Sequence, residues 1–306
     1  MNPSLASLIT KAASKQTYYT IRFLVDRPRV EDAYQTYGYF RWVDDVIDEH
    51  TCSEPERKAF IERQKSLLEK CYRGEFPQDA TAQEKMLIEL VLHDQEPNSG
   101  LQSYLRNMML VMEFDAKRRG RLISQIELHD YTHWLAVAVT EAMHHFIGHG
   151  EFAPRDETRY LAVSAAHITH MLRDTYDDVQ AGYFNIPREV LEANHIGPQD
   201  VYSDAYRAWV KSRVQLAREY FQAGRGYLRR VQNRRCRLAG FAYTARFEWL
   251  LDTFEREGYT LRPQYSERKR LGTGLRMVWL AFLNLARLPQ SDTLPQPVVS
   301  HPVNKL

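Results

Sequence analysis

Two segments of the chain carry charged side chains where a helix facing a protein core would carry apolar ones. In the first, steps of +4, +3 and +4 put four side chains on a single helix face, namely Tyr37, Arg41, Asp44 and Asp48. In the second, steps of +4, +3, +4 and +4 connect Val163, His167, His170, Asp174 and Asp178, with Arg173 beside them. Carboxylates one helical turn apart repel each other, so we expect a cation to bind both pairs.

Oxygen ligands of this kind suit Mg²⁺, with Mn²⁺ as an alternative, and Mg²⁺ usually binds through one or two carboxylates together with substrate phosphates. Arg41 and Arg173 lie next to the acidic faces, where they could hold diphosphate oxygens. A single acidic run is usually a solvated helix face. Two runs about 130 residues apart, each within apolar sequence, favour a joint site for metal and diphosphate.

The segments that must position these side chains show the hydrophobic periodicity of helices. Prolines and glycines separate segments of roughly 15 to 35 residues rich in Ala, Leu, Glu, Arg and Tyr, and no alternating strand or Asn-Gly hairpin is found. Helix starts are predicted at Ser53 and at Pro154. We expect about ten helices in one all-α domain over residues 1–288, followed by a flexible, proline-rich tail over residues 289–306.

Composition and charge argue against two further classes, nucleic-acid-binding proteins and membrane-spanning proteins. The chain has 306 residues with 41 Lys and Arg against 39 Asp and Glu, a near-neutral balance that argues against nucleic-acid binding. No apolar run approaches the roughly 20 residues that span a bilayer, no secretory signal is present, and the three cysteines are scattered. We expect a cytoplasmic protein without an obligatory protein partner. The apolar segment Leu275 to Leu285 would allow peripheral contact with the inner membrane face.

The acidic segments read Asp44-Asp45-Val-Ile-Asp48 and Leu172-Arg173-Asp174-Thr-Tyr-Asp177-Asp178, and they resemble the paired motifs of the squalene/phytoene synthase family. The resemblance extends from about Ser14 to Arg270 and includes Thr17-Tyr18-Tyr19 and Met112-Glu113-Phe114-Asp115. It implies a single-domain, isoprenoid-synthase-type helical bundle around a central cavity, with the acidic motifs facing each other across it. It also implies Mg²⁺-assisted loss of diphosphate from an allylic isoprenyl diphosphate, most simply C15 or C20, in a cavity that shields the carbocation from water.

Several positions depart from the family pattern. His167 and His170 stand where the family has Gln and a metal-binding Asn, so His170 is a candidate fifth metal ligand. Bulkier residues replace family glycines at Val137, Thr140 and Val163, and Asn185 and Phe247 replace tyrosines, while Gln264 replaces a phosphate-binding Arg. The resemblance implies substrate binding by Thr17, Tyr18, Tyr37, Arg41, Tyr131, Val137, Thr140, His167, Arg173, Asn185 and Phe247.

Three functions stay open. The favoured one is head-to-head coupling of two isoprenyl diphosphates, and the alternative is a terpene cyclase or a prenyl transfer to a non-isoprenoid acceptor at the same ionisation site. The third is a non-catalytic family member that acts as an assembly factor. Two Glu-x-x-His spacings, at Glu141 and Glu192, are compatible with a di-iron bundle, which is less favoured. The basic run Lys117-Arg118-Arg119-Arg121 is interpreted as a solvated helix face in preference to part of a diphosphate site.

Overall fold

Helices form most of the structure, a computed structural model that describes residues 4–49 and 53–265. The described residues contain one 3-10 turn (Arg27–Arg29), no strand, and eleven α-helices. The helices are α1 (Leu5–Ala13), α2 (Lys15–Leu24), α3 (Val30–Asp48), α4 (Glu54–Tyr72), α5 (Ala82–His93), α6 (Gly100–Arg118), α7 (Gln125–Phe146), α8 (Leu161–Ala181), α9 (Arg188–Asn194), α10 (Asp204–Arg230) and α11 (Arg234–Arg256). The all-α prediction is confirmed. The predicted tail and the segment Leu275 to Leu285 lie outside the described residues.

Side-chain caps explain where many of the helices begin. Ser53 accepts a hydrogen bond from the backbone N–H of Glu56, whose carboxylate accepts one from the Ser53 N–H in return. The same reciprocal cap begins α5 at Thr81 and α7 at Ser124. Each cap satisfies backbone N–H groups that have no partner inside the helix, so the predicted start at Ser53 is confirmed.

The helix start predicted at Pro154 is wrong, because α8 begins only at Leu161. Between Pro154 and Leu161, the side chains of two residues form hydrogen bonds that take the place of a helical turn. Asp156 accepts hydrogen bonds from both the backbone N–H and the hydroxyl of Thr158. Arg159 turns inward, where it is buried and bonded to Glu141 on α7. Local side-chain hydrogen bonds of this type compete with the helix, and proline spacing alone does not reveal them.

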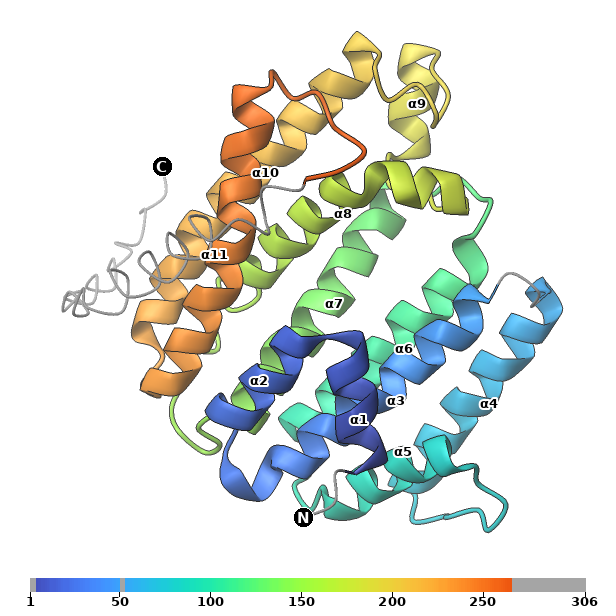
Figure 1. The fold of residues 1–306 in the computed structure, drawn as a ribbon, viewed down its shortest axis with the longest axis vertical. Helices are drawn as coiled ribbons and strands as arrows, with labels where there is room; N and C mark the ends of the chain where they lie inside the picture. The colour runs from blue at the N-terminus through green and yellow to red at the C-terminus, as the bar shows by residue number, and fades with distance from the viewer. Residues whose placement is uncertain (1–3, 50–52, 266–306) are drawn as a thin grey trace, which may run out of the picture.

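The helices form two packed groups that meet where the long helix α7 lies against α8. In Figure 1, α3, α4, α5 and α6 lie on one side of α7, and α8, α10 and α11 lie on the other, with α1 and α2 in front. The buried side chains divide in the same way into one cluster mainly of α1 to α7 and one mainly of α8 to α11. None of the helices in the described part of the chain is both long and apolar enough to cross a bilayer.

A glycine sets how closely α10 can cross α8. A Cβ atom built on Gly224 would lie 2.6 Å from the backbone nitrogen of Ala162, which is closer than nonbonded atoms approach. A Cβ on Gly226, two residues further along α10, meets nothing within 4 Å. The position of α8, which carries the second acidic segment, therefore depends on the missing side chain at residue 224.

We predict that Gly224→Ala lowers the free energy of unfolding by about 1–3 kcal/mol, because α8 and α10 must move apart to admit the methyl group. Gly226→Ala is the matched control and should leave stability unchanged or raise it by up to about 1 kcal/mol through better helix propensity. Urea unfolding followed by circular dichroism measures both. Equal stability of the two variants would contradict the close crossing.

Candidate active site

The two acidic segments lie at the C-terminal ends of their helices. Asp44 and Asp48 occupy the last turns of α3, and Asp174 and Asp178 occupy those of α8. The segment after α8 turns back through Gly182 (φ 86°), and the Tyr183 hydroxyl then donates a 2.9 Å hydrogen bond to the Asp48 carboxylate. The structure therefore brings the two motifs to the same end of the bundle.

Arginines already neutralise part of each motif. Arg41 contacts the carboxylates of both Asp44, at 3.3 Å, and Asp45. Arg173 holds Asp174 through two parallel hydrogen bonds of 2.5 Å from Nε and Nη2, and His170 Nε2 lies 3.1 Å from the same carboxylate. The remaining nitrogen of Arg173, Nη1, is buried and has no hydrogen-bond partner among the described residues. A buried donor of this kind is suited to an incoming anion.

A buried ion pair on α6 connects the two motifs. Arg118 Nε donates a 2.6 Å hydrogen bond to Asp115, and Arg118 Nη1 donates one of 2.8 Å to the side-chain oxygen of Asn185. The Asn185 amide in turn donates a 2.7 Å hydrogen bond to Asp178. Tyr131 on α7 completes the arrangement by donating a 3.1 Å hydrogen bond to Asp115. Direct hydrogen bonds thus link the buried ion pair on α6 to Asp178 of the second acidic motif, and they fix the orientation of the Asp178 carboxylate.

The interpretation of the basic run as a solvated face is wrong for one of its members. Arg118 is only 6% exposed and lies over the rings of Tyr131 and Tyr183, at 4.8 and 4.9 Å from their centroids. Lys117, next to it, is exposed and pairs with Glu113. Sequence reasoning left Asp115, Arg118 and Tyr183 out of the site. The spacing of Asp115 and Arg118, which puts them on one face of α6, is the signal that could have revealed the pair.

Burial and like charge raise the pKa of one carboxylate in each motif. The pKa of Asp44 rises to about 6, first because the group is buried and then because Asp48 is close. The pKa of Asp178 rises to about 7 through burial and the nearby Asp174. Neither α3 nor α8 carries a basic residue in its last turn, where the helix dipole favours positive charge. A cation bound between these helix ends would lower the two raised pKa values, and it would also balance the negative ends of the two helix dipoles.

The donor set fits Mg²⁺ in the manner that this ion prefers. Each motif offers two carboxylates, which leaves coordination positions for water and phosphate oxygens. Within residues 4–49 and 53–265, no three His, Cys, Asp or Glu side chains converge on one point as a ready-made metal cage. Glu141 is bound by Arg159 and by the Tyr160 hydroxyl, and His195 caps the short helix α9, so neither Glu-x-x-His spacing builds a di-iron site.

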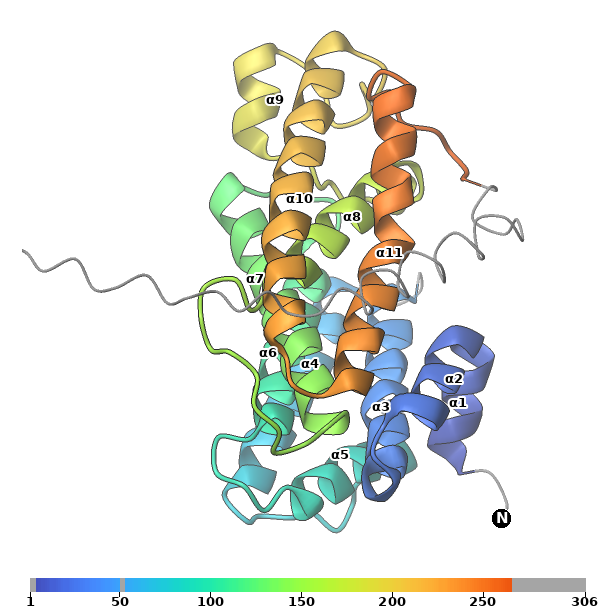
Figure 2. The ribbon, with the colours of Figure 1, turned by 90° about the vertical axis from the view of Figure 1, so that its left-hand side faces the viewer.

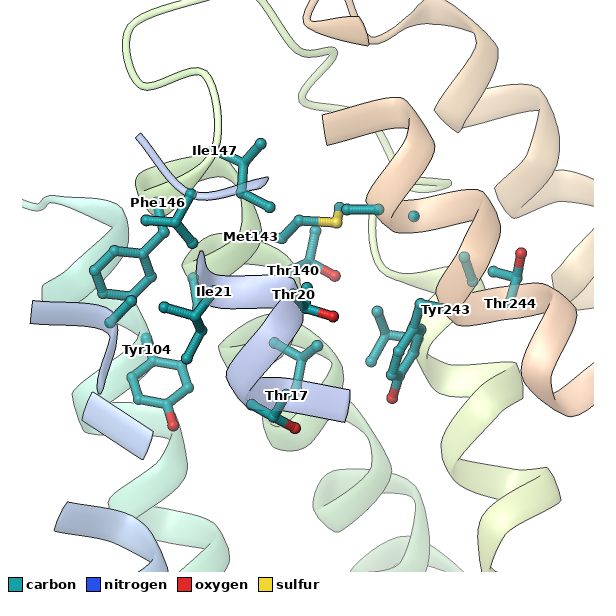
Figure 3. A pocket seen from close by; sticks show the side chains of 18 of the residues that line it. Thr17, Thr20, Ile21, Tyr104, Thr140, Met143, Phe146, Ile147, Tyr243 and Thr244 are labelled. Carbon is teal, nitrogen blue, oxygen red and sulfur yellow. The ribbon is translucent and has the colours of Figure 1, made fainter. Parts of the chain in front are cut away.

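An apolar cavity of about 390 Å³ is lined on α3 by Ala33, Thr36 and Tyr37, which precede the acidic motif of that helix. Thr17, Tyr37 and Thr140, which are predicted to bind substrate, line it, and so does Val163, which stands where the family has glycine. Figure 3 shows side chains from several helices pointing into it, with apolar groups such as Met143 and threonine hydroxyls on the walls. Its size is within the range of small-molecule sites.

Other predicted residues lie outside the wall of this cavity. Tyr18 stacks on Tyr34 with ring centroids 5.3 Å apart, and neither Val137 nor Phe247 is among the lining residues. Phe247 instead packs edge-on against His170, at 6.2 Å between ring centroids. Gln264 is exposed at the edge of the described residues.

His167 is buried next to Tyr131, with ring centroids 5.0 Å apart. Neither of its ring nitrogens has a hydrogen-bond partner in the described part of the chain. Burial, together with the positive charges of Arg118 and Arg213 and with His170, lowers the pKa of His167 well below its usual range. The imidazole is therefore neutral at physiological pH.

Comparison with known proteins identifies the family. Residues 10–273 match the model of the squalene/phytoene synthase family. The chain is 24% identical over 283 residues to 15-cis-phytoene synthase of Synechocystis sp. (87% of this chain and 79% of that protein), and 26% identical over 271 residues to the chloroplastic phytoene synthase of Narcissus pseudonarcissus (84% and 61%). The chain belongs to the squalene/phytoene synthase family, whose relatives are prenyltransferase-type enzymes.

Solved structures share the fold. The crystal structure of a squalene synthase from Alicyclobacillus acidocaldarius superposes with a TM-score of 0.67 at 19% identity, covering 84% of this chain and 94% of that one. A dehydrosqualene synthase crystallised with a ligand gives a TM-score of 0.63 at 16% identity, covering 91% and 93%. The prediction of an isoprenoid-synthase-type all-α fold is confirmed by both likenesses.

We predict that Arg118→Met destabilises the protein by about 3–5 kcal/mol, because it leaves the buried carboxylate of Asp115 without its counter-charge. Lys117→Met is the matched control on the exposed side of the same helix and should change stability by less than about 1 kcal/mol. Chemical denaturation of the two variants gives both values. A loss for Arg118→Met no larger than that of the control would remove the ion pair from its assigned role.

Proposed function

We propose that the protein ionises an allylic isoprenyl diphosphate with the help of Mg²⁺ and couples it head-to-head to a second one, with release of diphosphate. The observation that carries this proposal is that two carboxylate motifs meet at the same end of the helical bundle, on the two helices, α3 and α8, whose earlier turns line an apolar cavity. Membership of the squalene/phytoene synthase family supports the coupling of two prenyl units. The charged end would hold the diphosphate, and the apolar walls would hold the hydrocarbon chain.

Asp44, Asp48, Asp174 and Asp178 would hold Mg²⁺, or Mn²⁺ in its place, and His170 is a candidate fifth ligand through its position beside Asp174. The metal would supply positive charge that neutralises the departing diphosphate. Arg173 would contribute its buried Nη1 donor to a diphosphate oxygen, and Arg41 would act in the same way from α3. Asn185, held by Arg118, would keep Asp178 oriented.

The hydrocarbon chain, C15 or C20, would lie in the 390 Å³ cavity. Thr17 and Tyr37 line this cavity near the charged end, because Tyr37 lies one turn before Arg41 on α3. The buried Tyr131 and His167 would border the reacting carbons between the cavity and the motifs. Such a wall excludes water, which would otherwise capture the cation. We place this enzyme in the cytoplasm, with at most peripheral contact with the inner membrane face.

Thr140 and Val163 favour one alternative to coupling. Both side chains line the cavity at positions where the family has glycine, so they take space that a second prenyl chain would use. A terpene cyclase, or a transferase to a non-isoprenoid acceptor, would need room for only one prenyl chain. A non-catalytic assembly factor ranks last, because such a protein has no need of both carboxylate motifs.

Asp44→Asn and Asp174→Asn should each lower the rate of diphosphate release at least ~10²-fold, since each removes a group that stabilises the charge of the leaving group. Asp177→Asn is the matched control, because Asp177 is exposed on the same helix as Asp174. A coupled phosphate assay with C15 and C20 diphosphates measures the rates. Wild-type release from either of the first two variants would show that the metal site is wrongly assigned.

Val163→Ala should shift the preference of the enzyme toward longer prenyl diphosphates, because it removes two methyl groups from the cavity wall. The expected change in the ratio of kcat/KM between C20 and C15 substrates is roughly 10-fold. Val137→Ala, at a position that does not line the cavity, is the control and should leave this ratio unchanged. An equal shift in both variants would mean that cavity volume does not select the chain.

A further inference from the structure

A second cavity, separate from the apolar one, lies against another face of α8. It has a volume of about 600 Å³ and is enclosed mainly by α7, α8 and α10, which are labelled in Figure 2. α8 contributes Leu161, Ser164 and Ile168, whose steps of +3 and +4 form a different helix face from that of the acidic motif. None of the residues proposed above to bind metal, diphosphate or prenyl chain lines this second cavity.

An arginine on α10 faces this cavity without a counter-charge. Arg213 makes no ion pair or hydrogen bond with any described residue, although a half-buried guanidinium has five donors to satisfy. Burial lowers the pKa of Arg213, and the nearby Tyr220 is the other group that influences it. Arginine remains charged at physiological pH in spite of this shift. The fold thus keeps a half-buried cation without an ion pair at the wall of the cavity, where an anionic ligand can reach it.

The rest of the lining limits what this anion can be. Ile168, Trp209 and Leu216 offer apolar surface near Arg213, which suits a ligand with an apolar body. Glu157 lies in the same cavity and disfavours a polyanion such as a diphosphate. Asp156 also lines the cavity, but its carboxylate is bound by Arg230 at 2.6 Å and does not neutralise Arg213. One unpaired guanidinium matches one carboxylate, which it can bind through two parallel hydrogen bonds.

We propose that the cavity between α7, α8 and α10 is a second binding site, which takes a small amphipathic monocarboxylate with its carboxylate on Arg213 and its apolar body against Trp209 and Leu216. The site shares no lining residue with the proposed prenyl diphosphate site. Binding there does not require Mg²⁺.

Isothermal titration of the full chain with octanoate, without metal or prenyl diphosphate, tests the proposal. We expect one octanoate per chain, with binding weakened at least ~10-fold in Arg213→Met because the charged hydrogen bonds are lost. Arg207→Met is the matched control, since Arg207 is exposed on the same helix, pairs with Asp204 and does not line the cavity. It should bind octanoate as the wild type does. Octanol has the apolar chain but no carboxylate, and inorganic phosphate has negative charge but no apolar chain. Both should therefore bind weakly.

Thermal unfolding separates loss of binding from loss of the fold. Without octanoate, Arg213→Met should melt at the wild-type temperature or above it, because an unpaired, half-buried charge is replaced by an apolar side chain. Octanoate should raise the melting temperature of the wild type but not that of this variant. Arg213→Gln serves as a second variant if the methionine protein does not fold. Failure of the wild type to bind octanoate, or binding by both Arg213 variants as tight as that of the wild type, would overturn the proposal.

Discussion

A buried guanidinium, that of Arg118, is the interaction on which the geometry of the charged end depends. It pairs with Asp115 on its own helix, holds Asn185 in the segment after α8, and lies over the rings of Tyr131 and Tyr183. Through these partners it reaches all four helices that build the site, because Tyr183 contacts Asp48 of α3 and Asn185 contacts Asp178 of α8. In the low-dielectric interior, a charge network of this kind is stable only when every member is paired.

The helix α8 separates two environments with different chemistry. Its C-terminal half presents carboxylates, whereas Val163 near its N-terminus belongs to the wall of the apolar cavity. A substrate with a charged head and a hydrocarbon tail matches this polarity along the helix. The close crossing at Gly224 holds α8 against α10, so both ends of the proposed substrate site share one rigid support. The same helix turns its other lined face, with Leu161, Ser164 and Ile168, to the cavity of Arg213.

The sequence predicted which helices carry the acidic motifs better than it predicted the contacts between side chains of different helices. Helical periodicity placed Asp44 and Asp178 on the correct helices, and the cap at Ser53 was predicted because capping depends on neighbouring residues. Arg118 was misjudged, since a basic run has the same appearance whether its members face solvent or a buried carboxylate. The late start of α8 was missed for a related reason: Arg159 finds its partner, Glu141, on another helix. Contacts between distant segments are set by packing, which one sequence does not display.

Mass analysis of the products formed from C15 and C20 prenyl diphosphates with the wild-type protein and Mg²⁺ tests the central claim most directly. The account predicts release of diphosphate and a hydrocarbon product with twice the carbon count of the substrate. Products that contain a single prenyl unit from every substrate would contradict head-to-head coupling. Absence of diphosphate release in the presence of Mg²⁺ and Mn²⁺ would contradict the ionisation site itself.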